Sequence, residues 1–167
     1  RGLMAAASLA IEVGDSVAAE RFARTLVEHE PEASRAHALL GEALEHQRNY
    51  QGAEQAYRDA LRLDQRDVVG HMDLGRVLRV RGDLAAAEAS YSQALVLAPR
   101  DPAAFLGRGL VRMEQGQGDG AASDLERARQ LSPRDASVWV ALGDLRRAAS
   151  DLDAAVQAYR RALTLDP

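Results

Sequence analysis

Four histidines are the first residues in this sequence that could do chemistry, because a neutral imidazole is a common metal ligand. His37 and His71 lie 34 residues apart, and neither His29 nor His46 has a second histidine at the i,i+4 spacing of a helical metal site. The chain has no cysteine, which excludes thiolate metal sites and disulfide bonds. We therefore predict that His37 and His71 pack as flat side chains, and that the protein uses no metal and no other cofactor.

Two other patterns could belong to an enzyme. The glycine-rich segment 116–120 superficially resembles a phosphate-binding loop, but it lacks the Gly-Lys-Ser/Thr of a P-loop. No pair of carboxylates is placed to converge in a cleft, and no serine lies in a Gly-x-Ser-x-Gly motif. We predict that the acidic residues lie on solvent-facing surfaces and helix caps, and that the protein is not an enzyme.

The elements that carry these residues recur along the chain. Proline returns every 34 residues, at Pro31, Pro99, Pro133 and Pro167, and Gln65 occupies the one place where it is missing. A fixed period of this size indicates a repeat array. The units are residues 1–33, which are degenerate, 34–67, 68–101, 102–135 and 136–167, and we expect one domain over residues 1–167.

Each unit predicts two helices joined by a short turn. In residues 68–101, Leu74 and Leu78 belong to an apolar face at helical spacing, and Tyr91 belongs to a second such face. Between the two faces, Gly82 suits the left-handed conformation that ends a helix and Asp83 can cap the next one. The proline that closes a unit stops the second helix. The sequence thus predicts an all-α fold of about ten helices, two in each unit.

The recurring residues resemble the tetratricopeptide repeat, and the resemblance covers the whole chain. The last unit matches with Trp139, Leu142, Gly143, Ala155, Tyr159, Ala162 and Pro167. The second matches with His37, Leu40, Gly41, Leu44, Ala53, Tyr57 and Ala60, and the third with His71, Leu74, Gly75, Leu78, Ala87, Tyr91, Ala94 and Pro99. The resemblance implies a right-handed α-solenoid of stacked antiparallel helix pairs, the tetratricopeptide superhelix.

The resemblance also implies a binding surface, because in this family the first helix of each repeat lines a concave groove. The groove positions carry Ala38, Glu42, Glu45, Met72, Arg76, Arg79, Leu106, Leu110, Met113, Val140, Asp144 and Arg147, with Met4, Ser8 and Ile11 in the degenerate unit. Arginines flank an apolar strip from Met72 to Val140, so we expect a protein or peptide ligand, extended or helical, with apolar anchors and acidic residues. The lysines and asparagines with which chaperone-adaptor members hold a terminal carboxylate do not occur at the matching places.

The fourth unit departs from the pattern at two positions. Arg108 stands where leucine is expected, and Asp124 occupies a position on the facing helix. A subtype of the tetratricopeptide family pairs arginine and aspartate at these places, so the resemblance implies an Arg108–Asp124 ion pair inside the repeat.

The C-terminal repeat suggests an alternative function. It closes at Pro167 without a polar capping helix, so Leu152, Val156 and Leu163 are expected to form an uncovered apolar edge. The alternative is self-association, as a homo-oligomer through this repeat or as a structural segment of a larger assembly protein. A role in targeting or regulating a catalytic domain elsewhere in the parent protein stays open.

Composition narrows the class of protein. A net charge of −4 argues against binding to nucleic acid, and no apolar run is long enough for membrane insertion. All basic residues are arginine, which is typical of a GC-rich genome, and we expect a bacterial protein. The sequence begins with arginine and carries no signal peptide, so we expect it to belong to a longer chain, in the cytoplasm or the periplasm.

Overall fold

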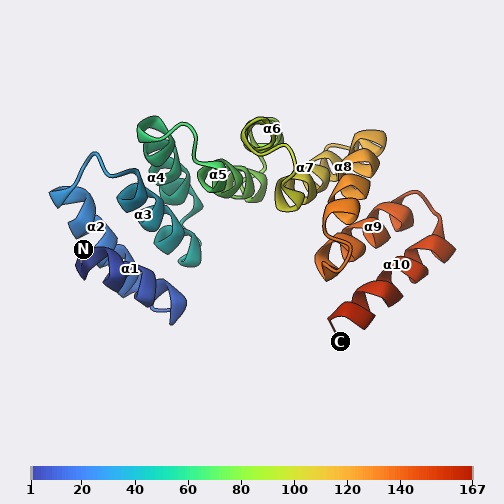
Figure 1. The fold of residues 1–167 in the computed structure, drawn as a ribbon, viewed down its shortest axis with the longest axis horizontal. Helices are drawn as coiled ribbons and strands as arrows, with labels where there is room; N and C mark the ends of the chain where they lie inside the picture. Colours follow the sequence, from blue (N-terminus) through green and yellow to red (C-terminus); the bar gives the residue numbers. More distant parts are fainter. Residues whose placement is uncertain (1, 167) are drawn as a thin grey trace. The chain divides into compact units, whose positions relative to one another are not determined.

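The computed structural model describes residues 2–166, and the described part contains ten α-helices and no β-strand (Figure 1). The helices are α1 (Gly2–Glu12), α2 (Ser16–His29), α3 (Ser34–His46), α4 (Tyr50–Leu63), α5 (Val68–Val80), α6 (Leu84–Leu97), α7 (Pro102–Glu114), α8 (Gly118–Leu131), α9 (Ala136–Ala148) and α10 (Leu152–Leu165). The predicted all-α class, with two helices in every unit, is confirmed. Arg1, and Pro167 with its predicted role in closing the last repeat, lie outside the described residues.

The turn inside each repeat contains one residue with positive φ. Gly14, Gly82 and Gly116 have φ values of 80°, 83° and 75°, and Arg48 and Ser150 occupy the same repeat position with 60° and 62°. Only glycine adopts this left-handed conformation without a steric cost from Cβ. The left-handed conformation that we predicted at Gly82 therefore ends the first helix of every repeat, including the two repeats that lack glycine at this position.

The residue after this turn caps the second helix in several repeats. The side chains of Asp15, Asn49 and Asp151 accept hydrogen bonds from the backbone N–H group of the third residue of the helix, at 2.9, 3.1 and 3.2 Å. Each bond satisfies one of the N–H groups that a helix start leaves without an intrahelical partner. The boundaries of the helix pairs thus follow from turn and cap residues spaced by the repeat.

The chain packs as two compact units, Arg1–Asp83 and Leu84–Pro167, which are described separately. In the first unit each helix from α1 to α5 packs on the next one, and α1 also contacts α3. In the second unit the same holds from α6 to α10, and α7 also contacts α9. The third repeat contributes α5 to one unit and α6 to the other, so a single domain over residues 1–167 stays a prediction.

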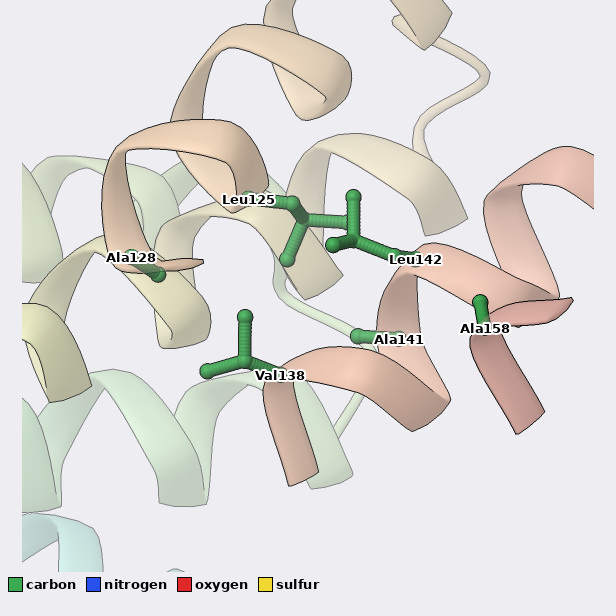
Figure 2. Close-up of a cluster of buried hydrophobic side chains, with 6 residues drawn as sticks. All are labelled: Leu125, Ala128, Val138, Ala141, Leu142 and Ala158. Atoms are coloured by element: carbon green, nitrogen blue, oxygen red, sulfur yellow. The ribbon is translucent and has the colours of Figure 1, made fainter. Parts of the chain in front are cut away.

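Small side chains dominate the core of each unit. In the second unit, Leu125 of α8 and Leu142 of α9 point toward each other, with Val138 and Ala158 nearby (Figure 2). In the first unit a comparable cluster joins α1, α2 and α3 around Leu26 and Leu39. Alanine between these larger residues lets the helices approach closely.

A tyrosine of the second helix packs against a glycine of a first helix. A Cβ atom on Gly41 would lie 2.7 Å from Cε1 of Tyr57, and one on Gly143 would lie 2.5 Å from Cε1 of Tyr159. These distances are shorter than a carbon–carbon contact, so any larger residue in the place of either glycine would push the ring away. The close approach that the repeat pattern assigns to glycine is therefore present in both repeats.

None of the helices in residues 2–166 combines the length and the hydropathy that crossing a lipid bilayer requires.

Candidate protein-binding surfaces

Four of the predicted groove residues gather around one hollow in the first unit. Glu42 and Glu45 reach it from α3, and Arg76 and Arg79 reach it from α5. Each arginine stands 34 residues after one of the glutamates, so the same position on two successive first helices supplies both charges. The hollow has a volume of about 710 Å³, and we call it the α3–α5 hollow.

Charged groups of both signs line the α3–α5 hollow. Arg76 forms ion pairs with Glu45 and with Asp73, the latter at 2.6 Å between Nη2 and Oδ1. The full charged lining consists of Arg35, Glu42, Glu45, Arg48, Asp73, Arg76 and Arg79, with His46 beside them. Four arginines face three carboxylates, so the lining carries a surplus of positive charge.

A buried tyrosine and a partly buried aspartate shape the electrostatics of the hollow. The hydroxyl of Tyr57 donates to Oε2 of Glu45 at 3.1 Å, and burial raises the pKa of Tyr57 far above its ordinary value, so it remains a neutral donor. Burial also raises the pKa of Asp73 to about 7, and the neighbouring carboxylates of Glu42 and Asp67 act in the same direction. The charge of the hollow therefore changes near neutral pH.

Exposed apolar side chains stand at the rim of the same hollow. Val69 is 56% exposed and Val80 is 49% exposed, and both belong to the residues that line it. The two other predicted groove residues of α3 and α5 do not line the hollow: Ala38 is buried and Met72 is partly buried. The apolar contacts available here thus come from valines that the sequence analysis did not single out.

In the degenerate unit, Met4 and Ile11 pack against the cluster around Leu26, and Ser8 is partly buried.

In the second unit, the predicted apolar groove residues of α7 lie against the core. Leu106, Leu110 and Met113 are partly buried and pack on the cluster that contains Leu125 and Leu142. Part of their surface is therefore occupied by the protein itself. The continuity of the predicted apolar strip from Met72 to Val140 stays a prediction, since these residues belong to different units.

The predicted groove residues of α9 lie on its exposed side. Val140 lines a hollow of about 390 Å³ together with Tyr159 and Leu163. Asp144 accepts a hydrogen bond from the Tyr159 hydroxyl at 2.7 Å, and Nη2 of Arg147 lies 3.6 Å from Oδ1 of Asp144. These contacts orient the carboxylate of Asp144 along the surface of the last repeat.

The ion pair expected between Arg108 and Asp124 is present in the second unit. Nε and Nη2 of Arg108 each donate to one oxygen of Asp124, both at 2.8 Å, which is the two-pronged geometry that suits arginine and carboxylate. Arg112 adds a third bond to Asp124 at 2.9 Å and binds Glu88 of α6 at 2.8 Å. The pair therefore belongs to a network that joins α6, α7 and α8.

The prediction that the acidic residues lie on solvent-facing surfaces and helix caps is wrong for two of them. Asp124 and Glu54 are buried, and Glu54 forms ion pairs with Arg58 and Arg81. Three glutamates spaced by 34 residues each contact the next repeat: Glu20 bonds Gln47, Glu54 pairs with Arg81, and Glu88 pairs with Arg112. The hydrogen bond from Arg112 holds the pKa of Glu88 below its ordinary value. The 34-residue spacing of these glutamates is visible in the sequence and was the signal that could have revealed them.

The ring nitrogens of three aromatic side chains have a role that the sequence analysis missed. Nε2 of His37 lies 2.9 Å from the carbonyl oxygen of Pro31, and Nε2 of His71 lies 3.1 Å from that of Gln65. Nε1 of Trp139 donates to the carbonyl oxygen of Pro133 at 2.9 Å. Each ring thus ties the first helix of a repeat to the carbonyl group six residues earlier. What His and Trp share, besides a flat shape, is a ring N–H group.

The histidines and carboxylates do not assemble into a metal site in the part of the chain that the structure describes, where no three potential ligands come together.

Comparison with known proteins identifies the class to which this helical repeat belongs. A family model of the tetratricopeptide repeat matches residues 4–68, 72–125 and 106–167. The matches extend over nearly the whole sequence, and the chain therefore belongs to the tetratricopeptide repeat family. Arrays of this kind are scaffolds whose stacked helices form extended surfaces for binding other proteins. No curated protein sequence matches the chain.

Solved structures support the same fold. The chain is similar to a MamA fragment from Desulfovibrio magneticus RS-1, with a TM-score of 0.85 and 20% identity over 96% of this chain and 90% of that one. YrrB, described as a tetratricopeptide protein with an unusual peptide-binding site, has a TM-score of 0.76 and 21% identity over 96% of this chain and 83% of that one. PilF of Pseudomonas aeruginosa has a TM-score of 0.83 and 22% identity over 100% of this chain and 79% of that one. At these identities the likeness concerns the fold.

Proposed function

We propose that this protein is a non-catalytic scaffold that binds a segment of a partner protein in the groove lined by its first helices. The observation that carries the proposal is the α3–α5 hollow, where four predicted groove residues come together. YrrB, which shares the fold, is described as having a peptide-binding site, and this supports a peptide as the kind of ligand.

The lining of the hollow favours a ligand with acidic and apolar side chains. Its surplus of arginine suits carboxylates, which arginine binds through two parallel hydrogen bonds. Val69 and Val80 at the rim offer contacts to apolar anchors. The partner segment is therefore expected to combine the two, either extended or as a helix with one apolar face.

A peptide-display selection tests this proposal. The selection uses the intact chain and a variant with Glu42→Arg and Arg79→Glu, which keeps the net charge while reversing the pattern of the hollow. A matched control carries Glu28→Arg and Arg62→Glu, two exposed side chains that do not line the hollow. We expect peptides with apolar and acidic residues to be enriched on the wild type and the control and lost on the first variant. Enrichment that ignores the Glu42/Arg79 exchange would contradict the proposal.

Self-association is a second candidate function, and it rests on α10. Leu163 is 65% exposed, whereas Leu61 at the same repeat position is 8% exposed and packs near Gly70 of the following helix. Leu9 and Val13, on α1 and just after it, are also exposed, whereas Ala43, Val77 and Val111, which are equivalent to Leu9 on the next three first helices, are buried. A second copy that placed its α1 on α10 would bury both faces, in the manner of consecutive repeats.

Light scattering at increasing concentration tests the second candidate. Association through α10 predicts a mass that rises with concentration and returns to the monomer value in Leu163→Asp. A mass that stays monomeric at millimolar concentration would exclude it.

A further inference from the structure

A second hollow lies in the other unit, on the face where α8, α9 and α10 meet. It has a volume of about 460 Å³, and none of the predicted groove residues lines it. Its apolar lining includes Leu142 and Ala158, two buried members of the core cluster (Figure 2). One side is formed by Trp139, the single tryptophan of the chain, and we call this feature the Trp139 hollow.

The Trp139 hollow concentrates positive charge on a protein whose net charge is negative. Arg129, Arg146 and Arg161 line it, and Glu126 is the one acidic residue of the lining. Arg129 donates to both oxygens of Glu126, at 2.8 and 2.5 Å, and these bonds hold the pKa of Glu126 below its ordinary value. The two charges therefore balance each other inside the hollow.

The two remaining arginines carry the surplus charge. In the described residues the ion pair of Arg146 is with Asp151 at 3.6 Å, and both side chains are about half exposed. Arg146 also acts electrostatically on Glu126. Arg161 is exposed and has no ion-pair partner within residues 2–166. Exposed pairs at such distances contribute little, so both guanidinium groups can exchange their present surroundings for a ligand carboxylate at small cost.

The aromatic side of the hollow is held in place before any ligand arrives. The Trp139 ring is fixed by its hydrogen bond to the Pro133 carbonyl, and the guanidinium group of Arg129 stacks over it at 5.6 Å from the ring centre. A preorganised surface loses little conformational entropy on binding. Tryptophan and arginine are also the residue types that most often dominate binding energy at protein interfaces.

From this arrangement we propose that the Trp139 hollow is a second binding site, which takes an acidic segment of a protein partner. A carboxylate of the segment pairs with Arg146 and Arg161, and an adjacent apolar side chain contacts Trp139 and Leu142. The site lies in a different unit from the α3–α5 hollow and uses different residues. This proposal can therefore be tested independently of the proposed function.

Fluorescence of Trp139 gives a direct test, because no other tryptophan contributes to the signal. The probe is a capped twelve-residue peptide that repeats Leu-Glu-Glu, and its counterpart repeats Leu-Gln-Gln. We expect a saturable change of Trp139 emission with the acidic peptide, weakened by salt, and no change with the neutral one.

Two neighbouring arginines of α10 provide a matched pair of variants. Arg161 lines the hollow and Arg160 does not, although both are exposed. Arg161→Glu is expected to weaken binding about tenfold or more, which corresponds to the loss of one charge-assisted contact, whereas Arg160→Glu leaves it within about twofold. Arg161→Lys should retain part of the affinity, because lysine keeps the positive charge but lacks the planar guanidinium group that can form two hydrogen bonds to one carboxylate.

Three outcomes would overturn the proposal. One is a Trp139 signal that does not respond to the acidic peptide up to millimolar concentration. Another is equal binding of the Leu-Gln-Gln peptide, since this would show that binding does not need carboxylates. The third is equal weakening by Arg160→Glu and Arg161→Glu, since this would show that the peptide responds to surface charge and not to a specific site. Circular dichroism of each variant shows whether the helices are intact before the titration is interpreted.

Discussion

Asp124 is a buried carboxylate that joins α8 to α7 through two arginines. It is 3% exposed and accepts three hydrogen bonds from Arg108 and Arg112. Removing one partner from a buried ion pair leaves the other charge without compensation, so Asp124→Ala should lower the free energy of unfolding by about 3–5 kcal/mol. Urea denaturation measures the change.

A control on the same helix separates burial from charge. Glu126 forms an ion pair with Arg129, but its side chain is 43% exposed. Glu126→Ala should therefore change the free energy of unfolding by less than about 1 kcal/mol. Equal losses in the two variants would contradict the buried network as the source of the effect.

The raised pKa of Asp73 predicts how the free energy of unfolding depends on pH. Its pKa of about 7 in the folded chain exceeds the ordinary value of 3.8, so the folded state holds this proton more tightly than the unfolded state. Stability from this group is therefore full below about pH 4 and is lost as the pH rises toward 7. Asp73→Asn removes this titration. The change in the free energy of unfolding that Asp73→Asn causes should therefore become more favourable between pH 4.5 and pH 8, by about 3 kcal/mol.

Urea denaturation of both proteins at the two pH values isolates this contribution, because all other carboxylates are shared. An effect of Asp73→Asn that is the same at pH 4.5 and pH 8 would show that burial does not perturb the carboxyl group of Asp73.

At the scale of elements, the turn between the helices of each repeat sets a backbone requirement that two repeats meet with the wrong residue type. Ser150 has φ of 62°, while Gly116 fills the equivalent place in the preceding repeat with φ of 75°. Ser150→Gly should raise stability and Gly116→Ala should lower it, each by about 1 kcal/mol, because only glycine escapes the steric cost of Cβ.

Thermal unfolding followed by circular dichroism measures both changes. No atom lies within 4 Å of a Cβ added at Gly116, so packing does not interfere with the comparison. A stabilising Gly116→Ala would mean that the turn can adopt another conformation.

Much of the element-level structure could be predicted because the repeat encodes it locally. The proline period, the turn glycines and the caps place all ten helices of the described part. The burial and orientation of particular side chains were harder to predict. Spacing put Glu42 and Arg76 at equivalent positions, but burial of Ala38 and the packing of Leu110 on α8 and α9 depend on how neighbouring helices approach, which a helical pattern does not specify.

At the scale of the molecule, the two proposed binding sites depend on contacts between repeats rather than on any single helix. The α3–α5 hollow needs residues from two repeats at the same position, and the Trp139 hollow needs three consecutive helices. Sequence analysis assigned roles to the first set through the family resemblance. It missed the second set because Trp139 reads as a packing residue and Arg146 and Arg161 read as ordinary surface charges.

The central claim is that a partner segment binds in the α3–α5 hollow, and hydrogen–deuterium exchange with a selected peptide tests it most directly. We expect slower exchange at the C-terminal turns of α3 and α5, where Glu45 and Arg79 lie, in the presence of the peptide. The Glu42→Arg/Arg79→Glu variant should show no such protection. Protection confined to α2 and α4, with α3 and α5 unchanged, would contradict the claim and place the binding surface on the second helices of the repeats.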